Sequence, residues 1–218
     1  SRLRELSFEV GMYRPPSEGA SRSLLLRFMR NCSWNKCTFC SMYKDEKFTY
    51  RSAEEIKQDV DTAKAMVDEM TKISHSLGRG GVIDRNTIYV ILRGDESLEY
   101  NNSFTNVAMW LLSGGKTAFL QDSNTPIMRP DDLIDSLKHL RSTFPSLERV
   151  TSYCRSDTLA RKKVEDLIRI REAGLDRLHI GMETGDDELL EWLRKLPNKN
   201  DGPTSDYHIV GGRKAKEA

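Results

Sequence analysis

The chain of 218 residues is 38% hydrophobic and 31% charged, with a net charge of +1, a composition typical of a globular domain with its own core. No apolar run approaches the roughly 20 residues that a spanning helix needs, so a transmembrane helix is excluded. The near-neutral charge gives no support to a nucleic-acid partner, although it leaves one open. Four cysteines in a chain of this length do not make a disulfide-stapled secreted domain, so we expect a cytoplasmic location and no membrane partner.

The first half of the chain predicts one strand and one long helix. Residues 23–28 form an apolar run typical of a buried strand. Ser52 and Glu55 have the spacing of a capping box, and apolar residues then recur at helical spacing, so we expect a helix over residues 53–73. Residues 87–93 are compatible with a strand or a helix, because periodicity cannot decide over so short a run.

The second half alternates strands with amphipathic helices. Strands are expected at residues 117–121, 149–153 and 177–181. Helices are expected over residues 103–112, from Pro130 onward, and over about 162–173, 186–194 and 208–218. This alternation indicates βα units around a parallel sheet or barrel, an α/β fold. It ends where another strand would follow, so we expect the chain to be a fragment that lacks its C-terminal strands.

Three cysteines lie on one short loop directly after the first predicted strand. Cys32, Cys37 and Cys40 have the spacing C-x4-C-x2-C. Cysteine sulfur is the soft ligand that iron–sulfur clusters prefer, and three thiolates can hold three corners of a cubane cluster. The fourth iron would then keep an open position, as catalytic metal sites do. Two closed sites with Cys154 as the fourth ligand remain as alternatives: a zinc site and a 2Fe-2S electron carrier.

The strand, the cysteine loop with aromatic Phe39 before its third cysteine, and the helix that follows resemble the radical S-adenosylmethionine (SAM) superfamily. The usual spacing there is C-x3-C-x2-C, so this loop must absorb one extra residue between Cys32 and Cys37. Within the superfamily, the chain looks like a poorly characterised family related to the coproporphyrinogen-dehydrogenase and tRNA-modifying branches. The stretches that carry this likeness are residues 14–44, 119–122, 149–153 and 181–185.

The resemblance implies a fold and an activity. The fold is a partial (β/α) TIM-type barrel over residues 1–218, truncated after about four barrel strands. Residues 1–22 would be an N-terminal extension, and residues 74–114 a helical insertion before the second barrel strand. The activity is reductive cleavage of SAM by a [4Fe-4S] cluster, giving a 5′-deoxyadenosyl radical that abstracts hydrogen from an unknown substrate. An external one-electron donor of the flavodoxin or ferredoxin type would be the partner. Beyond the cluster ligands, no catalytic residue is assigned.

Ligands of parallel barrels bind at the C-terminal ends of the strands, which points to the residues after each strand. After the second barrel strand these are Gln121, Asp122 and Asn124. Relatives commonly have Gly-Gly-Glu there, which binds the SAM amino group, and this chain has neither the glycines nor the glutamate. Asp122 or Asn124 can supply an acceptor instead, and an ordinary polar turn is the alternative.

Three further side chains are expected to contact SAM. Arg155, after the third barrel strand, can pair with the SAM carboxylate, unless it forms a surface ion pair. Glu183, after the fourth, would by resemblance bind the ribose hydroxyls or the amino group. Phe39 is expected near the adenine, with simple core packing as the alternative.

Overall fold

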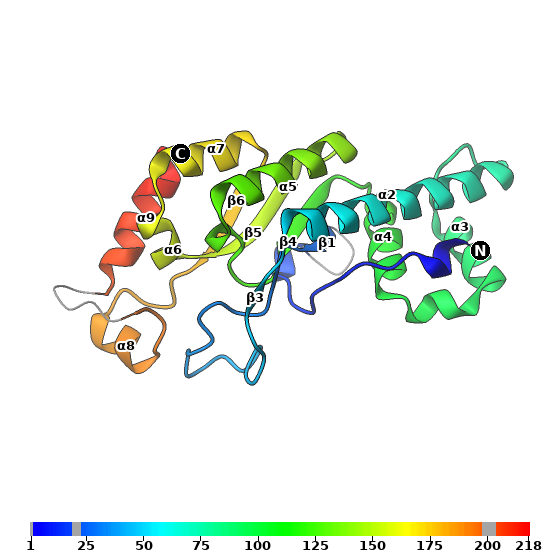
Figure 1. Ribbon diagram of the computed structural model, residues 1–218. Coiled ribbons are helices and arrows are strands. Elements are labelled where there is room, and N and C mark those ends of the chain that lie inside the picture. Colours follow the sequence, from blue (N-terminus) through cyan, green and yellow to red (C-terminus); the bar gives the residue numbers. More distant parts are fainter. Residues whose placement is uncertain (1, 19–22, 198–203) are drawn as a thin grey trace.

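The computed structural model describes residues 2–18, 23–197 and 204–218. Its centre is a parallel sheet of four strands in the order β1-β4-β5-β6 (Figure 1). These strands are β1 (Ser23–Arg27), β4 (Thr117–Gln121), β5 (Arg149–Arg155) and β6 (Arg177–Gly181). The predicted α/β class and the four predicted strands are confirmed. Their sequential order means that each βα unit lies beside the previous one, so all four C-terminal strand ends meet at one edge.

Alternation along the strands separates two faces of the sheet. Leu24, Leu26, Ala118, Leu120 and Val150 belong to the main hydrophobic core, on the face that the helices cover. Phe119 and Tyr153 lie on the other face and pack edge to face, with ring centroids 5.1 Å apart. Parallel strands with both faces occupied read as nearly continuous apolar runs, which is why these segments are recognisable in the sequence.

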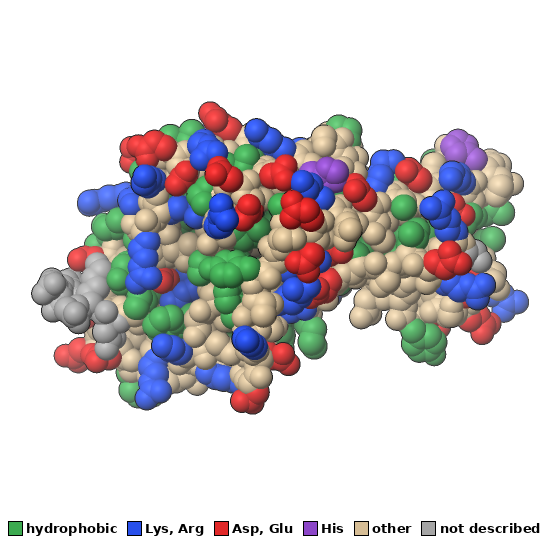
Figure 2. Space-filling model, in the orientation of Figure 1, with side chains coloured by type: hydrophobic (Ala, Val, Ile, Leu, Met, Phe, Trp, Pro, Cys, Tyr) green, Lys and Arg blue, Asp and Glu red, His purple; other side chains and the backbone are tan. Residues whose placement is uncertain are grey.

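The helix layer consists of α2 (Ala53–Ser76), α5 (Pro130–Thr143) and α7 (Val164–Glu172), which run side by side along one face of the sheet (Figure 1). The capping box is confirmed: the Glu55 N–H donates to Ser52 Oγ at 3.2 Å, and the Ser52 N–H donates to Glu55 Oε2 at 2.9 Å. Figure 2 shows acidic and basic side chains interspersed over this layer, so this face carries no continuous patch of one charge.

After the end of α2, residues 85–112 are mostly helical. They form α3 (Arg85–Gly94), a short 3-10 helix η3 (Glu96–Tyr100) and α4 (Asn102–Leu112). Residues 87–93 are therefore a helix, because the Asp84 carboxylate caps its first turn by accepting from the Thr87 N–H at 2.7 Å. The amide of Asn106 bonds both the N–H and the carbonyl of Leu25, at 3.1 and 2.9 Å. The side chain of Asn106 thereby satisfies part of the outer edge of β1.

The elements after β4 differ in detail from the prediction. One helix was expected over residues 162–173, but α6 (Ser156–Arg161) follows β5 directly and extended backbone at Lys162 and Lys163 separates it from α7. β5 also extends through Cys154 and Arg155, which were expected just past its end. The remaining helices are α8 (Asp187–Trp192) and α9 (Asp206–Glu217), close to the expected ranges. Residues 198–203, between α8 and α9, lie outside the described residues.

A small antiparallel pair of strands closes the cysteine loop. β2 (Met29–Arg30) pairs with β3 (Thr49–Tyr50), so residues 31–48 form a loop whose two ends are held together. Arg51 reinforces this closure by donating to the carbonyl of Arg27 at 2.6 Å. Among the described helices, none is long and apolar enough to cross a membrane.

Candidate functional site

A cavity of about 380 Å³ lies between the cysteine loop and the C-terminal ends of β5 and β6. Six of the nine predicted site residues line it: Cys32, Cys37, Cys40, Phe39, Arg155 and Glu183. The sheet therefore brings together the loop after β1, Arg155 at the end of β5 and Glu183 after β6. Gln121, Asp122 and Asn124 do not line this cavity.

The cysteine loop takes its shape from two asparagines in left-handed conformation, Asn31 at φ 67° and Asn35 at φ 49°. Asparagine tolerates this region better than most residues. At the second turn, the Asn35 N–H donates to Cys32 Sγ at 3.3 Å, and the Asn35 side chain donates to the carbonyl of Tyr43. The turn folds the chain back between Cys32 and Cys37, which accommodates the spacing of four residues.

The loop is also docked onto the segment after β6. The Thr38 N–H donates to the carbonyl of Leu193 at 2.9 Å, and Trp34 Nε1 donates to the carbonyl of Arg194 at 2.6 Å. Backbone groups on both sides fix this contact, so the position of the loop depends on the path of the chain beyond Glu183.

The three thiols share one electrostatic environment. Cys37 is 8% exposed, and burial raises the pKa of its thiol. The cations of Lys195 and Arg155 act in the opposite direction, whereas charges on Cys32 and Cys40 add to the increase. Three thiols on one cavity with two cations nearby suit a metal–sulfur cluster that carries net negative charge. In the part of the chain that the structure describes, no three His, Cys, Asp or Glu side chains are placed around a single-ion position. In a cubane cluster each cysteine binds a different iron, so the three thiols do not have to surround a single point.

Cys154 lies on the other face of β5. It borders the cavity, but its side chain packs with Leu159 and Leu167, and its Sγ donates to the carbonyl of Arg155 at 3.3 Å. Burial in this apolar cluster raises the pKa of the Cys154 thiol far above its usual value. To serve as a fourth ligand, the side chain would have to leave that cluster.

The accessibility of the four thiols predicts their order of alkylation in the metal-free chain. Cys32 and Cys40 are partly exposed and should react with iodoacetamide first, Cys37 more slowly, and Cys154 last, because only an accessible thiolate attacks. Peptide mapping by mass spectrometry over a time course at pH 8 measures this order. Early modification of Cys154 would contradict the buried position described here.

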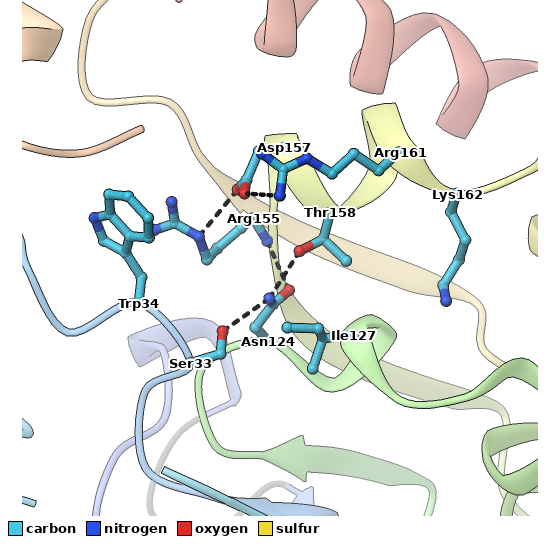
Figure 3. A pocket seen from close by; sticks show the side chains of 9 residues that line it. All are labelled: Ser33, Trp34, Asn124, Ile127, Arg155, Asp157, Thr158, Arg161 and Lys162. Carbon is cyan, nitrogen blue, oxygen red and sulfur yellow. Dashed lines mark hydrogen bonds and ion pairs between the residues drawn. The ribbon is translucent and has the colours of Figure 1, made fainter. Parts of the chain in front are cut away.

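Arg155 forms a buried ion pair. Its Nε donates to Asp157 Oδ1 at 3.0 Å, its Nη2 donates to the carbonyl of Lys195 at 2.7 Å, and the two side chains are 8% and 9% exposed. Its guanidinium lies 4.9 Å from the centre of the Trp34 ring (Figure 3). Arg155 thus links β5, the cysteine loop and the segment after β6, besides facing the cavity.

Glu183 stands at the rim of the cavity with its backbone in the left-handed region, at φ 65°. Its Oε1 accepts from Lys195 Nζ at 3.0 Å, and Lys195 Nζ lies 6.0 Å from the ring centre of Phe39. Phe39 is 52% exposed, so it borders the cavity and does not fill the core. Sequence reasoning missed Lys195, because a lysine between a short helix and a loop carries no local sign of a binding role. His179 and Tyr153, which also line the cavity, were missed too, although strand alternation could have placed both on the face of Arg155.

The three predicted residues after β4 bond the protein itself. Gln121 is fully buried and bonds the backbone of Gly11 and Tyr13, which holds the N-terminal segment against the sheet. Asp122 Oδ2 accepts from the Asn31 N–H at 2.7 Å. Asn124 joins the cysteine loop to α6, since its Nδ2 donates to the hydroxyls of Ser33 and Thr158 at 3.1 and 2.8 Å. Asp122 and Asn124 therefore position the cysteine loop, whereas Gln121 positions the N-terminal segment.

Comparison with protein-family models, with curated proteins and with solved structures found no match to this chain.

Proposed function

We propose that this chain is a radical SAM protein, in which Cys32, Cys37 and Cys40 hold a [4Fe-4S] cluster and SAM is cleaved reductively. The products are methionine and a 5′-deoxyadenosyl radical, which abstracts hydrogen from a substrate. The observation that carries the proposal is the meeting of three loop cysteines, Arg155 and Glu183 on one cavity at the C-terminal edge of a parallel sheet. When bound, the cluster supplies the electron that breaks the C–S bond of the SAM sulfonium.

The side chains of the cavity divide the binding of SAM between them. The charges of Lys195 and Arg155 favour the thiolate form of Cys37, and these two side chains are placed to attract the SAM carboxylate. Glu183 is placed to accept hydrogen bonds from ribose hydroxyls or the amino group, in exchange for its bond to Lys195. Phe39 offers an exposed ring to the adenine.

The sheet suits a partial TIM-type barrel. Its four strands follow one another in sequence order, as barrel strands do. Asn106 already satisfies Leu25 at the outer edge of β1, so further strands would pair with β6. The electron would come from an external carrier of the flavodoxin or ferredoxin type in the cytoplasm. A nucleic-acid substrate has no support from the charge of +1.

Anaerobic reconstitution with iron and sulfide tests the proposal. We expect about four iron per chain, a change in the EPR spectrum of the reduced cluster when SAM is added, and 5′-deoxyadenosine when dithionite and SAM are present. The alternative function is a closed iron–sulfur or zinc module with Cys154 as fourth ligand. Stoichiometric zinc in the purified protein, or a 2Fe-2S spectrum that disappears in Cys154→Ala, would establish that alternative and overturn the proposal.

A further inference from the structure

A second cavity, of about 310 Å³, lies beside the cysteine loop and shares Arg155 with the first (Figure 3). Ser33 and Trp34 of the loop form one side of it. The opposite side comes from α6 and the residue after it, chiefly Thr158, Arg161 and Lys162. None of the three cysteines of the loop lines this cavity, and the proposed chemistry of SAM does not use it.

The lining has more positive than negative charge. Three cations, Arg155, Arg161 and Lys162, face a single carboxylate, that of Asp157. Asp157 is already engaged by Arg155 at 3.0 Å, and Arg161 approaches its second oxygen only to 3.9 Å while donating to the neutral Tyr207 hydroxyl at 3.3 Å. The Lys162 ammonium donates to the carbonyl of Met128 at 3.1 Å, and within the described residues no carboxylate lies within 4.0 Å of it. Burial lowers the pKa of Lys162, and the charge of Asp166 offsets this effect only in part.

The neutral groups of the cavity add donors. The hydroxyls of Ser33 and Thr158 each accept from the amide of Asn124, so each keeps its own proton to donate. Figure 3 shows these hydroxyls on either side of the Asn124 amide, with the Arg161 guanidinium beside Asp157 and Lys162 just past the end of α6. Two hydroxyl donors and two cations bonded mainly to neutral groups, Lys162 to the Met128 carbonyl and Arg161 to the Tyr207 hydroxyl, form a set that matches the oxygens of a phosphate or a carboxylate group.

We propose that this cavity binds a small oxyanion, a phosphate or carboxylate group, between Lys162 and Arg161 and the hydroxyls of Ser33 and Thr158. The bound anion connects the cysteine loop to α6 and so stabilises the loop next to Cys32. The site is complete in the metal-free chain, and it holds whether or not the cysteines bind a cluster.

Isothermal titration calorimetry of the metal-free 218-residue protein tests the proposal. Inorganic phosphate and acetate are titrated separately at constant ionic strength set by chloride, so that the two sources of the oxyanion are distinguished. We expect saturable binding of one of them near one per chain, weakened about tenfold by Lys162→Gln and by Arg161→Gln, since each removes one charge-assisted contact. Lys163→Gln, the neighbouring exposed lysine that does not line the cavity, is the matched control and should bind as the wild type does.

Three results would overturn the proposal: binding of neither anion, binding unchanged in both cavity variants, or equal weakening by Lys163→Gln. The last would mean a general charge effect. The Arg161 side chain is 60% exposed, so Arg161→Gln should fold normally and tests the site even if Lys162→Gln does not fold. These titrations use the metal-free chain, so their outcome does not depend on whether the chain loads iron. Failure of anion binding and failure of cluster assembly are therefore distinguishable.

Discussion

Replacing Cys37 with alanine should leave less than about one iron per chain after anaerobic reconstitution, against about four in the wild-type protein. Cys37 is the most buried of the three loop thiols and lines the same cavity as Cys32 and Cys40. Its removal leaves two local thiolates, which are too few to hold a cubane with one open iron. Iron and sulfide analysis, together with the absorbance of the cluster, measures this effect.

Cys154→Ala is the matched control for this loss. Its sulfur lies in an apolar cluster with Leu159 and Leu167, so its replacement should cost a little stability and leave iron loading unchanged. Each variant removes one sulfur atom, from the cysteine loop in Cys37→Ala and from the apolar cluster of Leu159 and Leu167 in Cys154→Ala. Iron retained in Cys37→Ala and lost in Cys154→Ala would reverse the assignment and support the closed site with four ligands.

Arg27→Ala should lower the free energy of unfolding by about 3–5 kcal/mol, because it leaves the buried carboxylate of Asp122 without its cation. Arg27 Nε donates to Asp122 Oδ2 at 2.8 Å, and the Asp122 side chain is fully buried. The same oxygen accepts the Asn31 N–H, so the first residue of the cysteine loop depends on this pair. Urea unfolding of the metal-free chain measures the change.

Arg30→Ala serves as the comparison for Arg27→Ala. Arg30 pairs with Glu9 and Glu55, whose side chains are 29% and 43% exposed. Because water can solvate both carboxylates when Arg30 is removed, the free energy of unfolding should fall by about 1 kcal/mol or less. Adding Asp122→Asn to Arg27→Ala should recover part of the stability, since the uncompensated charge is then absent. Equal losses in Arg27→Ala and Arg30→Ala would contradict the role given to the buried pair.

The same variant has a defined pH dependence. Burial already raises the pKa of Asp122 in the folded protein, and loss of the Arg27 charge raises it further. A carboxyl whose pKa is higher in the folded than in the unfolded state takes up a proton on folding, so it favours folding more as the pH falls. The deficit of Arg27→Ala relative to the wild type should therefore shrink between pH 7 and pH 5. A deficit that grows over this range would contradict the assignment.

Local patterns were sufficient to predict most of the elements. The four strands, the capped start of α2 and the proline start of α5 depend on residues a few positions apart, and each was found where the pattern put it. The same holds for the grouping of Cys32, Cys37 and Cys40, because one loop of nine residues keeps them together. Residues 87–93 formed a helix for a local reason as well, the cap at Asp84, which periodicity did not detect.

Long-range contacts determined what could not be read from the chain. Gln121, Asp122 and Asn124 follow a strand, as ligand-binding residues do, yet they bond groups such as Gly11 and Asn31, which lie 110 and 91 residues away. Cys154 looked available as a ligand until the register of β5 directed it toward the helices and its neighbour Arg155 toward the cavity. Lys195 reached the cavity through the path of the chain after β6, where no motif marks it.

The difference between what local patterns and what long-range contacts determine has a physical basis. A thiol keeps its chemical preference for iron wherever it lies, so three thiols on one loop were enough to propose a cluster. Whether a carboxylate, an amide or a lysine binds a ligand depends on which partners have already bonded it, and those partners are brought in by the tertiary fold. The candidate cluster ligands therefore came from the motif alone. The pairing of Glu183 with Lys195, the buried ion pair of Arg155 and the second cavity beside it came from the packing of distant segments against one edge of the sheet.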